Sequence, residues 1–532
     1  MKIPVLFSLL AFSLCARAEL TDEQRRLPLE AASPDPNRPQ VWGYTDRLSY
    51  APGDKMALHL MSSAREVRVT IARDGLHRRV MLRRTVPGGF AETPEDCSVR
   101  GCGWPVQLAL TIPEGWQSGV YVLRMEIDGH ASEHMFVLRI ARPSARVLML
   151  LCTGTWCAYN DWGGSNHYQG MTGPEGRDFA AEVSLLRPWA TGFVRWPARA
   201  PRIPHASPPL TRPRYPHMEF ARANGVSKKY ASSGWAAFER PFALWCEREG
   251  IALDYATQHD LHRDPGLLDG YDRVLIAGHD EYWTWEMRDH LDAWLDGGGR
   301  LARFAGNFFW QTRLSGDLTV QTCYKSRAAE DPVADRRRLT TYWDAPSVDR
   351  PAVATIGLTG SAGVYAGWSR CAAQGSGGFA IYRPGHWSLA GTGLGYGDVL
   401  GRDATIFGYE VDGIDYTMRH GLPFAAVGAG LQGDLTIVGL SPATTLAHST
   451  GPDDADAFIG EEDARDVAAV IYGATDAGTF GRASRGNGCI AEYRRGRGAV
   501  FNAGSCEWVA GLIRRDPQVE RVTRNVLAGE WA

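Results

Sequence analysis

The chain has 532 residues, of which 44% are hydrophobic and 22% are charged, and its formal net charge is -3 at neutral pH. These proportions are typical of a soluble globular protein, and the length exceeds what one ordinary core holds, which predicts two or three domains. The small negative charge excludes nucleic acid and an anionic membrane surface as the main partner.

Residues 1–18 have the pattern of a secretory signal peptide. An early lysine precedes an apolar run from Ile3 to Leu14, and the A-R-A triplet that follows suits signal peptidase. We therefore expect cleavage before Glu19 and a secreted or periplasmic mature protein. Lipidation at Cys15 is the alternative, but a large leucine precedes this cysteine where a small residue is required. Elsewhere the sequence has no stretch of the roughly 18 apolar residues that a membrane span needs.

A first β domain is predicted after a linker. Residues 19–40 are polar and proline-rich, which indicates a linker or extended arm. Short alternating segments follow and are separated by turns, at 56–61, 66–71, 106–112, 119–125 and 132–140. Alternation with period two predicts strands, and no helical stretch lies between them. We expect an antiparallel β-sandwich over residues 41–141.

The pattern changes beyond a proline at position 143. Residues 147–152 are a continuous apolar run of the length of a strand buried on both faces. The switch from alternating to continuous runs predicts a layered α/β domain over residues 145–532. Within it we expect an aromatic, glycine-rich loop at 153–164, an irregular loop at 191–233 and a β-rich insertion at 311–480.

The most informative stretch of the α/β domain runs from Tyr271 to Asn307. Its first apolar run ends abruptly at G-H-D-E, a helical pattern follows and stops at three glycines, and a second apolar run ends on Asn307. In an open α/β sheet, ligands bind beyond the carboxyl ends of the strands. We therefore expect His279, Glu281 and Asn307 to face one crevice.

The remaining elements of the α/β domain are less regular. We predict helices at 238–250, 260–268 and 505–532, and strands at 251–255, 318–325, 379–383, 405–412, 434–440 and 489–501. The whole chain is therefore expected to be a multidomain β plus α/β protein, whose second domain has a mostly parallel sheet of the glutamine amidotransferase-like or flavodoxin-like type.

Several residues are candidates for catalysis or metal binding. His279 and Glu281 lie two apart, on the same side of an extended chain, as acid-base catalysis or metal binding requires. Hydrogen bonding within a polar loop is the alternative interpretation. Cys157 is a candidate nucleophile, with a buried inert thiol as its alternative. Glu410 lies in an acidic stretch, 410–415, for which calcium binding or turn capping are the alternatives.

The cysteines favour disulfides over a zinc site. Removal of the signal peptide leaves nine, an odd number, in a compartment that permits disulfides. Cys97 and Cys102, five positions apart across a glycine-containing loop, are the best candidate pair. The absence of a C-x-x-C pair argues against a structural zinc ion.

Five separated motifs together resemble one family. They are Y-N-D-W-G-G (159–164), G-H-D-E-Y-W (278–283), A-G-N-F-F-W (305–310), G-Y-E-V-D-G (408–413) and the tail at 501–527. In this order they resemble the large (catalytic) subunit of N,N-dimethylformamidase and its relatives. The segment 42–54 is similar to the family's entry into its N-terminal β-sandwich, so the resemblance spans nearly the whole mature chain.

The resemblance implies an amide hydrolase with one iron ion, Fe3+, held by two tyrosinates and a glutamate. Tyr159 matches one tyrosine ligand, and Glu281 matches the carboxylate ligand. His279 matches the catalytic histidine, Asn307 the catalytic asparagine and Glu410 a further acidic residue. Phenolate and carboxylate oxygens are hard donors, which suit ferric iron.

The second tyrosine ligand has no clear match. Trp189 stands near its expected position, and an indole cannot bind iron. Tyr168, Tyr215 or Tyr230 from the irregular segments are the candidate substitutes. Without one of them, the resemblance implies an altered or inactive site.

Together these patterns predict a secreted, iron-dependent hydrolase of a small amide or a related C–N bond. The expected partners are the amide substrate and either a small subunit or further copies of the chain. Two alternatives remain. One is a secreted binding protein with a degenerate site, and the other is a metal-free hydrolase that uses Cys157.

Overall fold

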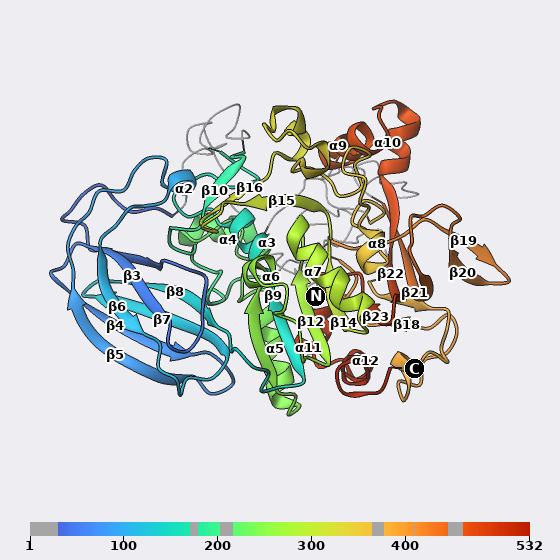
Figure 1. Cartoon of the computed structure of the whole chain (residues 1–532), viewed down its shortest axis with the longest axis horizontal. Coiled ribbons are helices and arrows are strands. Elements are labelled where there is room, and N and C mark those ends of the chain that lie inside the picture. The colour runs from blue at the N-terminus through green and yellow to red at the C-terminus, as the bar shows by residue number, and fades with distance from the viewer. Residues whose placement is uncertain are drawn as a thin grey trace, which may run out of the picture.

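The computed structural model describes residues 30–170, 179–202, 216–363, 377–408, 410–444 and 461–531. The predicted signal peptide, the first part of the predicted linker and Tyr215 lie outside these residues. The molecule is rich in strands, which form several sheets, and helices surround the largest one (Figure 1). Among the described helices, none is long and apolar enough to cross a membrane.

Two sheets form the N-terminal part of the chain, drawn in blue in Figure 1. One has the order β1-β3-β6 and the other β2-β8-β7-β4-β5. Their strands are β1 (Val41–Thr45), β2 (Ser49–Tyr50), β3 (Lys55–Ser62), β4 (Glu66–Arg73), β5 (Arg79–Pro87), β6 (Val106–Thr111), β7 (Gly119–Ile127) and β8 (His130–Leu138).

The two sheets share one hydrophobic core. Alternation with period two directs the apolar side chains of each strand toward the space between the sheets. Leu58 and Leu60 of β3 meet Val69 of β4 and Leu123 of β7 there. The neighbouring residues of β7 are buried as well, in the larger core that continues into the rest of the chain. Strand β7 is therefore covered on both faces, which fixes the N-terminal sheets against the α/β part.

Two details of this part differ from the prediction. A single helical turn, α2 (Cys97–Arg100), lies between β5 and β6, where no helix was expected. Strand β2 pairs with β8 in parallel, whereas the other strand pairs of these two sheets are antiparallel. Both features are too short to give a periodic signal in the sequence.

A nine-stranded sheet with the order β11-β9-β12-β14-β23-β22-β21-β17-β18 forms the centre of the molecule. Its strands are β9 (Val147–Leu151), β11 (Leu253–Thr257), β12 (Arg273–His279), β14 (Arg300–Gly306), β17 (Phe379–Ile381), β18 (Val399–Leu400), β21 (Asp434–Thr444), β22 (Arg485–Arg495) and β23 (Gly498–Asn502). Figure 1 shows β9, β12, β14 and β23 near the middle and β22, β21 and β18 toward the right.

The sheet is parallel over one half only. Strands β11, β9, β12, β14 and β23 are parallel neighbours, and the pairing of β9 with β12 confirms the prediction made from their apolar runs. From β23 to β18 all neighbours are antiparallel. The expectation of a mostly parallel sheet was therefore wrong for the second half. A hairpin turn at Gly496, which has φ +54°, joins β22 to β23 where one strand was predicted.

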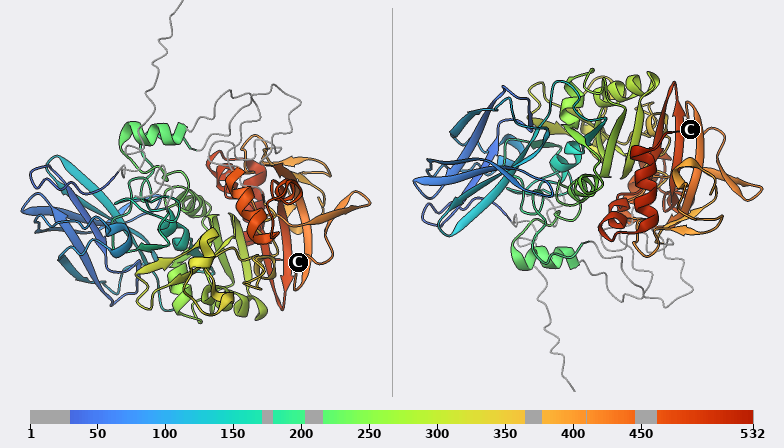
Figure 2. Two further views of the ribbon diagram at one scale, coloured as in Figure 1. Left: turned by 90° about the horizontal axis from the view of Figure 1, so that it is seen from above. Right: turned by 90° about the horizontal axis from the view of Figure 1, so that it is seen from below.

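The helices near the parallel strands form two groups. The first contains α5 (Glu239–Arg248), α11 (Trp508–Ile513) and α12 (Pro517–Ala528). The second contains α3 (Thr153–Tyr159), α6 (Gln258–Arg263) and α7 (Trp285–Asp296). Figure 2 shows α11 and α12 in red beside the sheet. Phe304 of β14 packs between Phe242 and Trp508, so aromatic side chains fix the first group to the sheet.

Helix α3 replaces the first half of the loop expected at 153–164. Gly154 conceals it in the sequence, since glycine is a poor helix former. The glycine is needed because a Cβ at this position would lie 2.5 Å from the backbone oxygen of Tyr282. Close packing of α3 on the following segment therefore overrides the local preference.

The remaining elements confirm some predictions and correct others. They are β10 (Glu182–Ser184), α4 (Pro216–Asn224), β13 (Tyr282–Thr284), β15 (Trp310–Leu314), β16 (Val320–Thr322), α8 (Val353–Ile356), β19 (Tyr416–Arg419), β20 (Leu422–Ala425), α9 (Glu461–Ile471) and α10 (Ala477–Ala483). Helix α4 lies inside the predicted irregular loop. In 405–412 the described residues form no strand, only a bridge from Val411 to Ser505. The tail has two helices, α11 and α12, instead of one.

Candidate active site

The predicted site residues come together at the carboxyl ends of the parallel strands. Tyr159 is the last residue of α3, His279 ends β12 and Asn307 follows β14. Glu281 is two residues beyond His279, and Glu410 reaches the same place from the loop before β19. Five residues that are far apart in the sequence therefore form one cluster.

The backbone at two of these positions is unusual. Gly278 has φ +89°, and a Cβ there would lie 2.1 Å from Cβ of Phe238, so only glycine fits immediately before His279. Asn307 has φ +65°, a left-handed conformation that few residues other than glycine tolerate. Such conformations concentrate at functional sites, where the surrounding structure holds them in place.

His279 lies between two carboxylates. Its Nδ1 is 2.8 Å from the backbone oxygen of Ser232, so Nδ1 carries the proton that is donated there. Its Nε2 is 2.6 Å from Oε2 of Glu410 and 3.2 Å from Oε2 of Glu281. Burial lowers the pKa of His279, but the two carboxylates outweigh burial and raise it to about 10. The hydrogen bond to Ser232 therefore orients the ring, and at neutral pH His279 is an imidazolium whose Nε2 faces the two carboxylates.

Asn307 presents its side-chain amide to the same cluster. Its Nδ2 donates to Oε2 of Glu410 at 2.7 Å and is 3.3 Å from Nε2 of His279. Its Oδ1 is buried and has no hydrogen-bond donor among the described residues. Asn307 thus has a positioned N–H donor and an acceptor oxygen that remains available.

The second tyrosine beside Glu281 is Tyr168. Its hydroxyl donates to Oε1 of Glu281 at 2.5 Å, and its ring centroid is 4.3 Å from that of Tyr159. Trp310 Nε1 donates to the same carboxylate oxygen at 2.6 Å. Burial and the charge of Glu281 raise the pKa of Tyr168 well above its usual value, so Tyr168 is a phenol in this arrangement. Two phenols and one carboxylate lie side by side.

The structure removes the difficulty that Trp189 posed. Its indole stacks on Phe193 and packs edge-on against Trp156, and its Nε1 is 3.4 Å from the backbone oxygen of Met135. The side chain of Trp189, which stands near the expected position of the second tyrosine in the sequence, belongs to the core between the two parts of the molecule. Tyr230 is also excluded, since its hydroxyl donates to the backbone of Pro201.

The residues fit a hard metal ion such as ferric iron. Tyr159, Tyr168 and Glu281 offer oxygen donors, which are the type that hard cations prefer. Oε2 of Glu281 is buried and has no hydrogen bond within the part of the chain that the structure describes. The imidazolium of His279, with Nε2 at 3.2 Å, compensates the charge of this oxygen here, and a metal ion could take over that role.

Sequence reasoning did not find the two lysines near the tyrosines. Lys325 Nζ lies 3.2 Å from the ring centroid of Tyr168, and Lys229 Nζ lies 4.8 Å from the same centroid. Both lysines are more than nine-tenths buried. Burial lowers the pKa of Lys229 to about 7. Their positive charge partly offsets the two carboxylates, and no signal for them was present in the sequence because lysine is ordinarily an exposed residue.

A buried arginine ties the site loops together. Arg303 of β14 donates from Nε to Oδ2 of Asp280 at 2.9 Å and from one amino group to Oδ2 of Asp412 at 2.5 Å. All three side chains are inaccessible to solvent. Asp280 separates His279 from Glu281, and Asp412 accepts from the backbone N–H of Phe308, next to Asn307. Arg303 therefore sets the relative position of three site segments.

We expect Arg303→Met to destabilise the protein by about 3 to 5 kcal/mol, because two buried carboxylates lose their partner. Urea unfolding measures this change. Arg300→Met is the matched control on the same strand, since Arg300 is 34% exposed and pairs with Asp272 at 3.2 Å. The control should cost at most about 1 kcal/mol. Equal losses in both variants would contradict the proposed role of Arg303.

Glu239 is a buried carboxyl group that binds the side chain of Trp156 in α3. Its Oε1 accepts from Nε1 of Trp156 at 2.8 Å, and its Oε2 is buried without a hydrogen bond among the described residues. Burial raises the pKa of Glu239 from 4.5 to about 8. The neutral carboxyl therefore favours the folded state fully below about pH 4.5, and this contribution is lost as the pH rises through about 8.

We expect Glu239→Gln to be more stable than the parent protein at about pH 9 and similar to it at about pH 4. The difference should reach a few kcal/mol, because one unit of pKa difference corresponds to about 1.4 kcal/mol. Thermal and urea unfolding at both pH values measure it. Glu114→Gln, at an exposed position, is the control. A Glu239→Gln variant whose stability follows the parent at both pH values would contradict the assignment.

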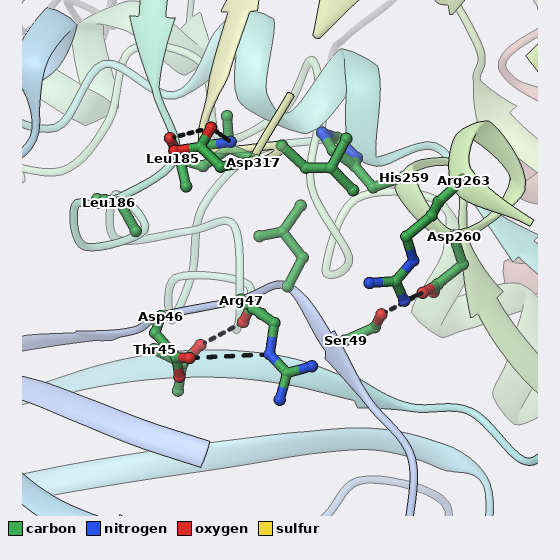
Figure 3. A pocket seen from close by; sticks show the side chains of 13 residues that line it. Thr45, Asp46, Arg47, Ser49, Leu185, Leu186, His259, Asp260, Arg263 and Asp317 are labelled. Atoms are coloured by element: carbon green, nitrogen blue, oxygen red, sulfur yellow. Dashed lines mark hydrogen bonds and ion pairs between the residues drawn. The ribbon is translucent and has the colours of Figure 1, made fainter. Parts of the chain in front are cut away.

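A separate, small cavity of about 60 Å³ lies between the N-terminal sheets and the α/β part (Figure 3). Its lining includes Arg47, His259 and Arg263, but none of the predicted site residues. His259 Nδ1 is 2.8 Å from Oγ1 of Thr153, at the start of α3. This cavity therefore contacts the far end of the helix that carries Tyr159 and is not the site itself.

The structure does not support the roles predicted for Cys157, Cys97 and Cys102. Cys157 is buried within α3, and burial raises the pKa of its thiol to about 12, which is the opposite of nucleophile activation. Cys97 and Cys102 are both buried free thiols, so the predicted disulfide is not formed here. These observations argue against the cysteine-hydrolase alternative.

The fold and the site define a mixed α/β protein with phenol, carboxylate and imidazole groups gathered at the ends of its parallel strands. The chain belongs to the family described as N,N-dimethylformamidase beta subunit-like, C-terminal, which matches residues 68–520. The resemblance noted in the sequence is thus confirmed at the level of the family.

Two relatives have the same name. The N,N-dimethylformamidase beta subunits of Paracoccus aminophilus and of an Alcaligenes species are 25% and 26% identical to this chain over 231 residues. The alignments cover 41% of this chain and 29% of each relative. The match therefore spans under a third of the length of these curated relatives, which are named as beta subunits.

Proposed function

We propose that this protein is a metal-dependent amidohydrolase, in which Tyr159, Tyr168 and Glu281 hold one ferric ion. The observation that carries the proposal is the hydrogen bond of 2.5 Å from Tyr168 to Glu281, beside Tyr159, in a buried site. A hard cation can replace the phenol proton and use all three oxygens. Membership in the N,N-dimethylformamidase beta subunit-like family supports hydrolysis of a small amide.

When bound, the ferric ion would supply a Lewis acid that polarises an amide carbonyl. The remaining steps belong to side chains. Since its pKa is about 10, His279 would enter the reaction as an imidazolium, give its Nε2 proton to the leaving amine nitrogen and then take up the proton released by the attacking water. Asn307 Nδ2 would donate a hydrogen bond to the oxygen on which charge develops. Glu410, at 2.6 Å from His279, would hold the imidazolium before the first transfer and after the second.

The net reaction consumes one water and breaks one C–N bond, and it yields a carboxylic acid and an amine. We propose a small linear amide as the substrate, because the side chains of the site are buried and enclose little space between them. We also propose that the mature protein is secreted or periplasmic, from the signal pattern at residues 1–18. A small subunit or further copies of the chain are the proposed partners, since the relatives are named as subunits.

Metal analysis and spectroscopy of the purified protein test this proposal. We expect about one iron per chain, a visible tyrosinate-to-iron charge-transfer band, and turnover of at least one amide in a broad screen of formamides and N-alkyl amides. A protein that takes up no iron, shows no band after reconstitution and hydrolyses no amide would refute it. That result would favour a binding protein with a degenerate site.

A further inference from the structure

We propose that His279, Glu410 and Cys506 form a second metal site, which takes a zinc ion and thereby inhibits the enzyme. Each side chain offers one ligand atom, and these three atoms lie within 4.8 Å of one another. The site combines nitrogen, oxygen and sulfur donors, the set that zinc uses in proteins. It is distinct from the all-oxygen set of Tyr159, Tyr168 and Glu281.

Cys506 is fixed beside the other two residues by the backbone. Its N–H donates to the backbone oxygen of Glu410 at 3.0 Å, and a Cβ on Gly306 would lie 3.1 Å from its Sγ. Its thiol has no hydrogen bond among the described residues. By contrast, Cys152 donates its S–H to a backbone oxygen and Cys489 to a side-chain amide oxygen. The Cys506 thiol is thus directed at the cluster without a local partner.

His279 has the orientation of a metal ligand. Its Nδ1–H donates to the backbone oxygen of Ser232 at 2.8 Å, which leaves Nε2 to face Glu410. Metal-binding histidines almost always use the other ring nitrogen in this way, because the hydrogen bond fixes both tautomer and ring direction. Nε2 is therefore the atom that would bind zinc.

The separations suit zinc after a small adjustment. Zinc bonds of about 2.0 to 2.3 Å place donors on one tetrahedral ion about 3.3 to 3.8 Å apart. His279 Nε2 and Glu410 Oε2, now 2.6 Å apart, would open, and the Cys506 sulfur would move inward. The thiol and the imidazole each release one proton to solvent as their metal bonds form. The fourth position would take a water molecule.

The consequence rests on the proposed function of the site. Zinc at Nε2 of His279 would occupy the atom that moves protons during hydrolysis and would also engage Glu410. Zinc should therefore inhibit turnover without displacing the ferric ion, because three hard oxygen ligands favour the ferric ion, whereas the sulfur donor favours zinc. Inhibition would be reversed by a chelator that removes zinc.

Cobalt(II) replaces zinc as a spectroscopic probe in the full-length, iron-loaded protein. We expect about one cobalt per chain, with a near-ultraviolet thiolate-to-cobalt charge-transfer band. For the zinc-loaded protein, we expect the X-ray absorption spectrum at the zinc edge to show one sulfur neighbour at about 2.3 Å. In Cys506→Ser and Cys506→Ala the band and the sulfur signal should vanish, and cobalt affinity should fall at least about tenfold, with iron content unchanged. Cys489→Ser, at a buried cysteine outside the cluster, should behave as the parent protein.

Two results would overturn the proposal. One is a zinc edge spectrum of the parent protein without a sulfur neighbour, which needs no variant to fold. The other is equal cobalt affinity and an unchanged band in both Cys506 variants. These readouts do not depend on amide turnover, so a failure of the proposed zinc site can be distinguished from a failure of the proposed hydrolase activity. Where turnover is measurable, zinc should inhibit the parent at least about tenfold more tightly than Cys506→Ser.

Discussion

Glu281→Ala is expected to abolish iron binding and, with it, amide turnover. The substitution removes the carboxylate that accepts from Tyr168 at 2.5 Å and from Trp310 at 2.6 Å. It leaves two phenols without the anionic oxygen of Glu281, and a neutral pair of phenols is a weak ligand set for a hard cation. Iron content by elemental analysis and the visible charge-transfer band should both fall to background.

The matched control is Glu95→Ala, because Glu95 is exposed on the segment before α2. This variant should retain iron, the visible band and full turnover. Circular dichroism should show that Glu281→Ala is folded, since its carboxylate is held by side-chain hydrogen bonds and no buried cation depends on it alone. Full iron occupancy in folded Glu281→Ala would refute the ligand assignment.

The strands that position the site were predictable, because burial on both faces leaves a clear sequence signal. The apolar run of β12 ends at His279 and that of β14 ends one residue before Asn307, while β9 leads into α3, whose last residue is Tyr159. Parallel pairing then brings His279 and Asn307 together without further information. The rule that ligands bind beyond the carboxyl ends of parallel strands, applied to three apolar runs, was thus enough to predict where the site residues gather.

The second tyrosine was not predictable from spacing along the chain. Trp189 stood near the expected position, but Tyr168 reaches Glu281 because it follows α3 through a turn that returns to the site. Helix α3 itself was missed, since Gly154 masks its periodicity. The sequence therefore left Tyr168, Tyr215 and Tyr230 as candidates, and the packing of α3 shows that Tyr168 is the one beside Glu281.

The buried charges carried a weaker signal that could have been used. Arg303 stands inside an apolar run, where a guanidinium is tolerated only when carboxylates surround it. Asp280 and Asp412 each lie beside a predicted site residue and were candidates for that role. Cys506 lies in the tail motif used for the family resemblance, but its chemistry is visible only beside His279 and Glu410.

His279→Ala is expected to separate metal binding from turnover. Its Nε2 lies 2.6 Å from Glu410 and 3.2 Å from Glu281, and its ring lies edge-on to Tyr159 with centroids 5.1 Å apart. The imidazole is not needed for the oxygen ligand set, so iron content and the charge-transfer band should persist. The rate constant kcat should fall by about 10² to 10⁴, the typical contribution of one general acid-base group.

His77→Ala is the control, since His77 is exposed in the loop between β4 and β5. The same two readouts distinguish the roles of Glu281 and His279: loss of the band with loss of turnover indicates a ligand, whereas loss of turnover alone indicates a proton-transfer group. A His279→Ala variant that loses iron would place His279 among the ligands of the ferric ion. One that keeps full kcat would exclude His279 from proton transfer, because Glu410 would then suffice for both steps.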